Sequence, residues 1–225
     1  MSNYKYETHL HTREASACAS ASGAEQARRY KELGYDGIFV TDHFFNGNTS
    51  VREYTDWADR VHKFCQGFEH AREEGQRIGL KVFFGIEYCY DGADLLVYGI
   101  DEDWLLKNPD VMDINVYDFC TRVRQHGGLI VHAHPFREAG YLREIKLLPQ
   151  WVDAVEVHNC GNATQAMNDR ARWFAEQYGL PMTAGTDNHH LSTERISGIT
   201  TEQPLMTPQD YVTAVKSGRV GLIIA

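Results

Sequence analysis

Histidines recur in this chain at the ends of short apolar runs, and two pairs of them show a spacing typical of metal ligands. His9 and His11 flank a leucine after an alternating stretch, and His132 and His134 flank an alanine farther along. Side chains two apart on a strand point to the same side of the sheet. Each pair could therefore bind one ion, and imidazole nitrogens are common ligands of zinc, iron and manganese.

Further imidazoles and carboxylates follow the other apolar runs. They are Asp42, His43, Glu87, His158, Asp187, His189 and His190. Taken singly, each has a structural explanation, such as a helix cap for Asp42 or a turn for Asp187. Taken together, they would be costly to bury without cations. The pattern therefore favours a centre of two or three ions, with the two oxygens of Glu87 as the bridge.

Seven strands separated by helices are expected to position these side chains. The expected strands are residues 4–11, 37–41, 80–85, 94–100, 128–132, 154–157 and 181–186, and the expected helices are residues 22–33, 54–78, 115–126, 163–178 and 208–216. This alternation predicts a single α/β domain over residues 1–225 with a parallel sheet and crossover helices. A nearly closed, TIM-like (β/α) barrel is the preferred architecture, and an open doubly wound sheet is the alternative. In such barrels the chemistry lies at the C-terminal ends of the strands, where the polar residues fall.

Composition narrows the class of protein. The net charge of −9 makes a long nucleic-acid partner unexpected, because such binding surfaces are usually basic. The sequence contains neither a recognisable signal peptide nor a membrane-length apolar run, so a cytoplasmic location is the default. Five scattered cysteines without a Cys-x-x-Cys pair argue against disulfides and a thiolate zinc site. The cysteines are expected to be small buried hydrophobic residues. Cys18 and Cys160 are the exceptions to this expectation, because each follows a histidine-bearing segment.

The ordered motifs resemble the PHP (polymerase and histidinol phosphatase) family of metal-dependent phosphoesterases. The resemblance covers roughly residues 4–190. It rests on His9-Leu-His11, Thr41-Asp-His43, Gly85-Ile-Glu87, Val131-His-Ala-His-Pro135, Glu156-Val-His-Asn159 and Gly185-Thr-Asp-Asn-His189. It implies a distorted seven-stranded (β/α) barrel that binds up to three divalent ions, manganese, iron or zinc, in a cleft at the strand ends.

The resemblance also implies a ligand for each ion. Carried over by position, the ligands are His9, His11, Glu87 and Asp187 for the first ion, Glu87, His134 and His158 for the second, and His43 and His189 for the third. The family often adds an aspartate or histidine to the third ion soon after the opening pair, and here Glu14 is the only carboxylate among residues 12–17. His134 precedes a proline and matches the family better than His132, and Asp42 is expected to orient a neighbouring histidine.

The expected reaction is hydrolysis of a small phosphate monoester by water activated at a di- or trinuclear centre. Adjacent divalent ions neutralise phosphoryl oxygens and lower the pKa of water. His43, Asp187 and His189 are the expected catalytic groups. Arg13, Arg137 and Arg195 lie in loops that would surround the cleft, and guanidinium groups match the geometry of phosphate.

Three other functions remain open at this stage. A phosphodiesterase or nuclease acting on nucleotides or short oligonucleotides would use the same chemistry with a different leaving group. An amidohydrolase would share the opening His-x-His, but it usually needs eight barrel units and a carbamylated lysine as the bridge. A non-catalytic metal-binding domain or a metal sensor is the third. The sequence names neither the substrate nor the oligomeric state.

Overall fold

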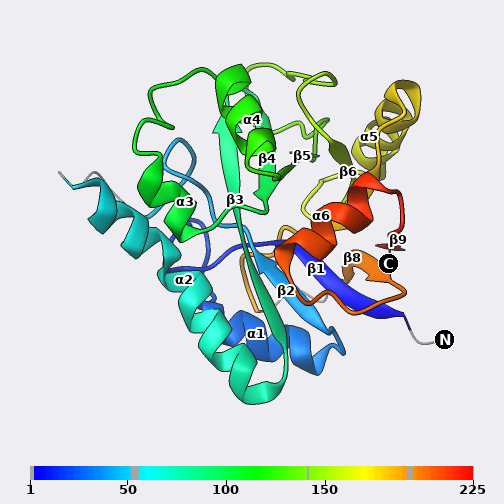
Figure 1. The fold of residues 1–225 in the computed structure, drawn as a ribbon. Coiled ribbons are helices and arrows are strands. Elements are labelled where there is room, and N and C mark those ends of the chain that lie inside the picture. The colour runs from blue at the N-terminus through cyan, green and yellow to red at the C-terminus, as the bar shows by residue number, and fades with distance from the viewer. Residues whose placement is uncertain (1–2, 52–55, 141, 192–194, 225) are drawn as a thin grey trace.

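The computed structural model describes residues 3–51, 56–140, 142–191 and 195–224, and its strands belong to one mixed sheet. The strands are β1 (Tyr4–Leu10), β2 (Gly37–Val40), β3 (Lys81–Tyr90), β4 (Ala93–Tyr98), β5 (Leu129–Ala133), β6 (Ala154–Asn159), β7 (Met182–Gly185), β8 (Ser197–Thr201) and β9 (Gly221–Ile224). Their order across the sheet is β7-β6-β5-β4-β3-β2-β1-β8-β9 (Figure 1).

The sheet curls until β7, at one end of this order, lies beside β1. The backbone N–H of Asp187 donates to the carbonyl of His9 at 2.8 Å, and the N–H of His11 donates to the carbonyl of Asn188 at 2.9 Å. These bonds lie just beyond the C-terminal ends of both strands. The result is a single α/β domain with a nearly closed, barrel-like sheet.

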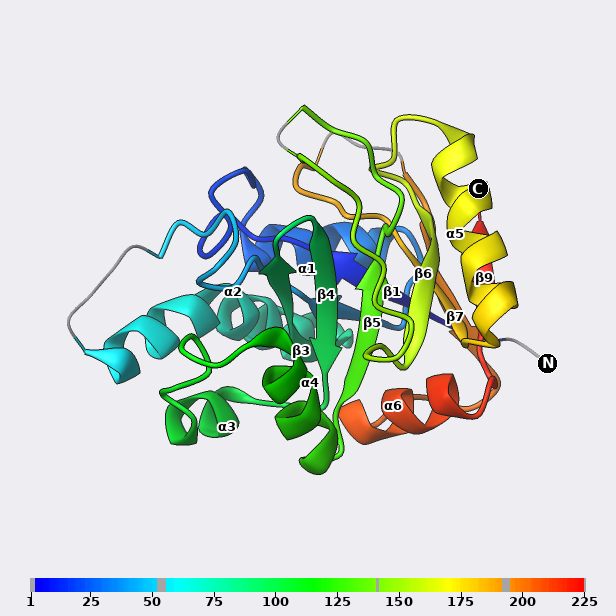
Figure 2. The ribbon, with the colours of Figure 1, turned by 90° about the horizontal axis from the view of Figure 1, so that it is seen from above.

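Six helices of the described chain lie around the outside of the curled sheet (Figure 2). They are α1 (Gly23–Glu32), α2 (Trp57–Ile78), α3 (Glu102–Lys107), α4 (Val116–Gln125), α5 (Gln165–Tyr178) and α6 (Pro208–Lys216). The sequence predicts all of them except α3, and the first residues of its expected helix at 54–78, residues 54 and 55, lie outside the described chain. Among the described residues, no helix combines the length and apolarity needed to span a membrane.

The predicted count of seven strands is wrong. All seven expected strands are present, but β8 and β9 add an antiparallel pair on the far side of β1. β8 pairs with β1 through Tyr6 and Ile199, and β9 is the apolar tail of the chain. β8 contains a serine, a glycine and two threonines around a single isoleucine, and β9 is exposed at both ends, so neither carries an alternation that pattern alone can recognise.

The prediction of an all-parallel sheet with crossover helices is also wrong, because β3 and β4 form a hairpin. Cys89 pairs with Asp94, and the connecting residues Asp91 and Gly92 have φ values of 40° and 92°. Positive φ at both central residues is the type I′ geometry that Asp-Gly sequences favour in two-residue hairpins. The hairpin brings the start of β4, with Asp94, to the same end of the sheet as Glu87.

A core of aromatic and aliphatic side chains fixes α4 against the β3–β4 hairpin. Phe119 on α4 is fully buried, and its ring stacks on that of Tyr88 with centroids 4.0 Å apart. On the other face of the sheet, Phe39, Tyr98 and Tyr211 pack together. These clusters hold the strand ends rigidly, which a site built from several strands requires.

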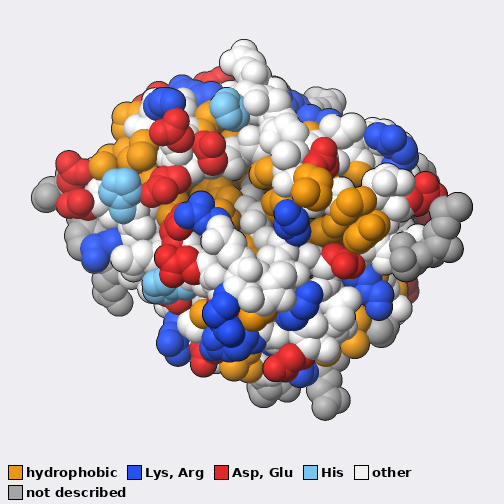
Figure 3. Space-filling model, turned by 60° about the horizontal axis from the view of Figure 1, so that its bottom comes forward, with side chains coloured by type: hydrophobic (Ala, Val, Ile, Leu, Met, Phe, Trp, Pro, Cys, Tyr) orange, Lys and Arg blue, Asp and Glu red, His pale blue; other side chains and the backbone are white. Residues whose placement is uncertain are grey.

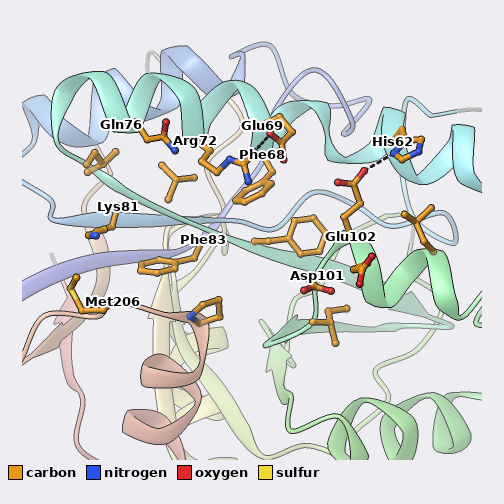
Figure 4. A pocket seen from close by; sticks show the side chains of 17 residues that line it. His62, Phe68, Glu69, Arg72, Gln76, Lys81, Phe83, Asp101, Glu102 and Met206 are labelled. Atoms are coloured by element: carbon orange, nitrogen blue, oxygen red, sulfur yellow. Dashed lines mark hydrogen bonds and ion pairs between the residues drawn. The ribbon is translucent and has the colours of Figure 1, made fainter.

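A cavity of about 610 Å³ lies at the N-terminal end of β3, among α2, α3 and the start of α6 (Figure 4). Phe68 and Phe83 supply apolar lining, while the ion pair between His62 and Glu102 lies at its edge. The face of the molecule in Figure 3 shows hydrophobic side chains in a hollow, with acidic and basic side chains interspersed around it. This cavity shares no lining residue with the histidine-rich site at the opposite end of β3.

Candidate metal centre

Five strand ends deliver imidazoles and carboxylates to one buried cluster. Its members are His9 and His11 from β1, His43 after β2, Glu87 from β3, His134 after β5, and Asp187 and His189 after β7. Within the described chain, three subsets have ligand atoms within 4.8 Å of one another: His9 with Glu87 and His134, His9 with His11 and Asp187, and His11 with His43 and His189. The C-terminal ends of these strands converge because the sheet is nearly closed.

Glu87 lies at the middle of the cluster, and each of its oxygens faces a different pair of imidazoles. Oε1 is 3.1 Å from His134 Nε2 and 3.4 Å from His9 Nε2. Oε2 is 2.7 Å from His43 Nδ1 and 3.4 Å from His11 Nε2. Burial alone would raise the pKa of Glu87, but His43 and His9 hold it well below its usual value. Glu87 is therefore an ionised carboxylate placed to bridge two cations.

Asp187 closes the opposite side of the cluster. Its Oδ1 is 3.2 Å from His11 Nε2 and 3.4 Å from His9 Nε2, and its Oδ2 is 2.6 Å from the Nη2 of Arg137. Burial opposes ionisation, yet His9 and Arg137 hold the pKa of Asp187 well below its usual value. The φ values of Asp187 and His134 are 53° and 26°, a left-handed region that non-glycine residues rarely adopt. Such strain is typical of functional sites.

Glu156 fixes the tautomer of His9. Its Oε1 is 2.9 Å from His9 Nδ1, and its Oε2 accepts hydrogen bonds from the backbone N–H of His134 at 3.0 Å and from Asn159 Nδ2 at 2.8 Å. An ionised carboxylate can only accept, so His9 Nδ1 carries a proton, and Nε2 is the ring nitrogen that a cation in the cluster would bind. This is the carboxylate–histidine arrangement that orients metal ligands.

Asp42 fixes the tautomer of His11 through Ser16. The Ser16 hydroxyl donates to Asp42 Oδ1 at 2.6 Å, so its oxygen accepts from His11 Nδ1 at 3.0 Å. Thr12 donates to the same carboxylate through both its N–H and its hydroxyl. Burial raises the pKa of Asp42 to about 6. His11 Nε2 is therefore left as a lone pair that faces Glu87 and Asp187.

The donor set fits divalent cations. His9 Nε2 and His11 Nε2 lie 3.2 Å apart, and both face the carboxylates of Glu87 and Asp187. Two further atoms at the cluster, Glu87 Oε2 and His43 Nδ1, are buried 2.7 Å apart as an ion pair without the geometry of a hydrogen bond. Buried acceptors that converge in this way repel one another unless cations lie between them. Imidazole nitrogen with carboxylate oxygen suits zinc, iron or manganese.

The structure does not bring two of the predicted ligands to the cluster. Glu14 points away: its carboxylate accepts from the N–H of Gly23 at 3.2 Å and lies 2.9 Å from His70 Nδ1. His158 lies on another side of β6, where its Nδ1 is 3.0 Å from the hydroxyl of Ser197. A register shift in the pairing of β6 with β7, between Glu156 and His158, accompanies this placement, and Glu156 is the residue of β6 that reaches His9.

His132 also lies away from the cluster. Its Nε2 is 3.1 Å from the carbonyl of Lys146, and its ring packs edge-on against Phe174. Burial lowers the pKa of His132 to about 4, so the ring is neutral near pH 7. His132 is therefore a core residue, and His134 alone of this pair reaches the cluster.

One of the three predicted phosphate-binding arginines lies at the cluster. Arg137 contacts Asp187 and donates to Asn159 Oδ1 at 2.8 Å, and its side chain is 14% exposed. The side chain of Arg13 is 57% exposed and lies 3.5 Å from Glu25. Arg195 is exposed and lines a separate cavity that also contains His158 and Cys160.

A cavity of about 720 Å³ opens onto the cluster. Its lining includes most of the cluster residues and extends to the β3–β4 hairpin: Cys18, His43, Asn46, Gly47, Asn48, Glu87, Cys89, Tyr90, Asp91, Gly92, Asp94, His134, Arg137, Leu142, Asp187, His189 and His190. The guanidinium of Arg137 and the imidazoles of His43 and His189 thus share one cavity with both cluster carboxylates. This arrangement can hold cations and an anionic ligand side by side.

Sequence reasoning missed three residues at this site. Glu156 was quoted in a motif without a role, although a carboxylate within an apolar strand is a signal of a buried polar partner. Asp94 comes within 3.9 Å of His134 Nε2, and burial raises its pKa. Cys18 forms side-chain hydrogen bonds with His189 and His43; its partial burial would raise the pKa of the thiol, but these bonds lower it to about 6.

Comparisons with known proteins give one family-model match and several shared folds. A family model described as PHP-associated matches residues 166–220. A two-domain protein from Bacteroides vulgatus, described as containing a predicted PHP-like metal-dependent phosphoesterase, has a TM-score of 0.73 at 14% identity; the match covers 99% of this chain and 65% of that one. Among curated protein sequences, none matches this chain.

Two other solved structures share the fold. One, from Bifidobacterium adolescentis, is named as a candidate metal-dependent phosphoesterase and has a TM-score of 0.61 at 16% identity, covering 96% of both chains. The other is a lesion-specific endonuclease from Pyrococcus furiosus, with a TM-score of 0.66 at 13% identity, covering 99% of this chain and 58% of that one.

The fold and the converging ligands define a class of proteins with a multinuclear metal centre at the end of a barrel-like sheet. Residues 166–220 thus resemble a PHP-associated family model, and the chain shares its fold with a protein described as containing a PHP-like phosphoesterase.

Proposed function

We propose that this protein hydrolyses a small phosphate monoester at a centre of two or three divalent ions, manganese, iron or zinc. The observation that carries the proposal is the convergence of the buried side chains of His9, His11, Glu87 and Asp187 beside a cavity whose wall contains Arg137. Cations and a guanidinium in one cavity suit a phosphoryl group.

The ligands divide between the ions according to which lone pairs face each other. His9, His11 and Asp187 would hold the first ion, and Glu87 would join it to a second ion at His134. When bound, the ions would neutralise phosphoryl oxygens and lower the pKa of the attacking water.

The side chains on the cavity side would orient the substrate. His43 and His189 are 15% and 18% exposed, whereas His9 and His11 are fully buried, so the first pair is placed to face the substrate. Arg137 would direct its guanidinium to a phosphoryl oxygen while Asp187 and Asn159 hold its position.

A small substrate suits the size and charge of the protein. A cavity of about 720 Å³ is in the range of small-molecule sites. The net charge of −9 opposes a long polyanion, whose binding depends on many basic contacts. An amidohydrolase reaction has less support, because the central bridging position holds Glu87 rather than a lysine.

The direct test is turnover of a panel of phosphorylated metabolites by enzyme loaded with manganese, iron or zinc. We expect hydrolysis of some monoesters, and loss of that activity in Asp187→Asn with an unchanged circular dichroism spectrum. Inactivity toward the whole panel with ions confirmed bound would refute the proposal. Faster cleavage of a labelled oligonucleotide than of any monoester would favour the nuclease alternative.

Conservative substitutions test which of the three predicted arginines binds the substrate. Arg137→Lys keeps the charge beside Asp187 but loses the planar fork, so we expect kcat/KM to fall about 10-fold or more. Arg13→Lys and Arg195→Lys are matched controls whose side chains are exposed outside this cavity. An equal loss in all three variants would contradict the assignment of Arg137.

A further inference from the structure

We propose that Cys18, His43 and His189 form a metal site of their own on the cavity side of the cluster, and that this site takes zinc or another thiol-binding cation. The inference rests on the proposed metal centre and names a ligand that no resemblance supplied. Cys18 would take the place of Glu14 as the third ligand, because the Glu14 carboxylate is engaged with Gly23 and His70.

The three side chains meet although they come from three distant segments. The Cys18 side chain lies within interaction range of those of both His43 and His189. All three residues line the cavity of about 720 Å³. The rings of His43 and His189 have centroids 5.7 Å apart, so one cation could reach both imidazoles and the thiolate.

The backbone holds Cys18 in this position. The N–H of Ser20 donates to the carbonyl of His189 at 2.9 Å, and the N–H of Ala17 donates to the carbonyl of Asn48 at 2.9 Å. One bond ties the loop to the segment after β7, and the other ties it to the segment after β2. The loop is thus anchored to the two segments that carry the histidines, which prepares a ligand site before any ion binds.

The remaining lone pairs favour Cys18 as the third ligand over the neighbouring His11. The proton of His11 Nδ1 is engaged with Ser16, and its Nε2 faces Asp187 and Glu87 at 3.2 and 3.4 Å. His189 directs Nδ1 to the carbonyl of Asp187 at 2.9 Å, which leaves its Nε2 as a lone pair. His43 directs Nδ1 to Glu87 Oε2 at 2.7 Å, which leaves its Nε2 as the nitrogen that a cation beside Cys18 would bind.

A thiolate changes which ion the site selects. Manganese and magnesium prefer oxygen ligands, whereas zinc and cobalt bind thiolate together with imidazole. Two imidazoles and one thiolate are three protein ligands, the number typical of zinc sites that keep a position for water or substrate. The thiolate would therefore favour zinc or cobalt over manganese at this site.

Cobalt(II) spectroscopy tests the thiolate ligand without an activity assay. Titrating Co²⁺ into metal-free protein should produce a near-ultraviolet sulfur-to-cobalt charge-transfer band, and Cys18→Ser should lose the band and bind one ion fewer. Cys89→Ser is the matched control: Cys89 lines the same cavity and contacts His43 and Asp94, and its removal should keep the band. Circular dichroism verifies that each variant is folded.

Alkylation gives a second readout in the wild-type protein. Saturating Zn²⁺ should protect Cys18 from iodoacetamide, measured by peptide mass spectrometry, while labelling of Cys160 in a different cavity stays unchanged. A charge-transfer band that persists in Cys18→Ser, or that disappears in Cys89→Ser, would overturn the proposal. If the wild-type protein binds two Co²⁺ ions and shows no charge-transfer band, the Cys18 site is refuted but the metal centre is not. If the protein binds no Co²⁺ at all, the whole metal centre is refuted.

Discussion

Replacing Glu156 with glutamine tests whether a residue outside the ligand set controls metal affinity. The Glu156 side chain is fully buried and accepts hydrogen bonds from His9 Nδ1, the N–H of His134 and Asn159 Nδ2. Glutamine has the same shape, but one end becomes an NH₂ donor. That donor must face either His9 Nδ1–H, which loses one hydrogen bond, or the pair of donors at the other oxygen, which loses two.

The expected loss of metal affinity in Glu156→Gln is 10- to 100-fold, or about 1.4 to 2.7 kcal/mol. The loss arises because His9 is no longer held in the tautomer with a lone pair on Nε2. The donor conflict should also lower the free energy of unfolding of the metal-free protein by about 1 to 3 kcal/mol.

Competition with a chromophoric chelator measures the affinity for Mn²⁺ or Zn²⁺, and urea unfolding measures the stability. Glu176→Gln is the matched control, because Glu176 is exposed on α5 and the substitution changes the net charge equally. We expect its affinity to stay within about twofold of wild type, since exposed charges are screened. If Glu156→Gln binds metal as tightly as Glu176→Gln, the orienting role of Glu156 is refuted.

Three further predictions concern the metal, pH and the core. Chelation should lower the melting temperature, since an ion at 100 times its Kd adds about 2.7 kcal/mol, and an unchanged calorimetric melting temperature would contradict the metal centre. Because burial lowers the pKa of His132 to about 4, only the unfolded chain gains this proton below pH 6.5. Stability should therefore fall between pH 6.5 and 4 by up to about 1.4 kcal/mol per pH unit, and less steeply in His132→Gln; equal slopes in urea unfolding would refute this. Phe119→Ala should cost about 3 to 5 kcal/mol in urea unfolding while keeping the ion stoichiometry, and a cost below about 1 kcal/mol would show that its stacking on Tyr88 is unimportant.

Much of the metal centre could be predicted from the sequence because each ligand is tied to the end of a strand. The His-x-His spacing of His9 and His11 and the polar residues after later strands are local features, and a curled sheet gathers strand ends whatever the details of its packing. The structure accordingly brings His9, His11, Glu87 and Asp187 together.

The direction of the strands depended on turn chemistry that periodicity does not record. Asp91-Gly92 is a hairpin signal in the sequence, but the expectation of repeating strand–helix units outweighed it. Likewise, β8 and β9 are stabilised by pairing across the sheet rather than by their own pattern.

The sequence by itself determined the seven strands that lead into the site, most of the helices and the kinds of ligand available. Only the tertiary structure decided which polar residues share the centre. A one-residue shift along a strand reverses the direction of a side chain, so Glu156 faces His9 while His158 faces Ser197. Loop conformation placed Cys18 beside His43 and His189 and turned Glu14 away, because non-local hydrogen bonds determine the path of that loop.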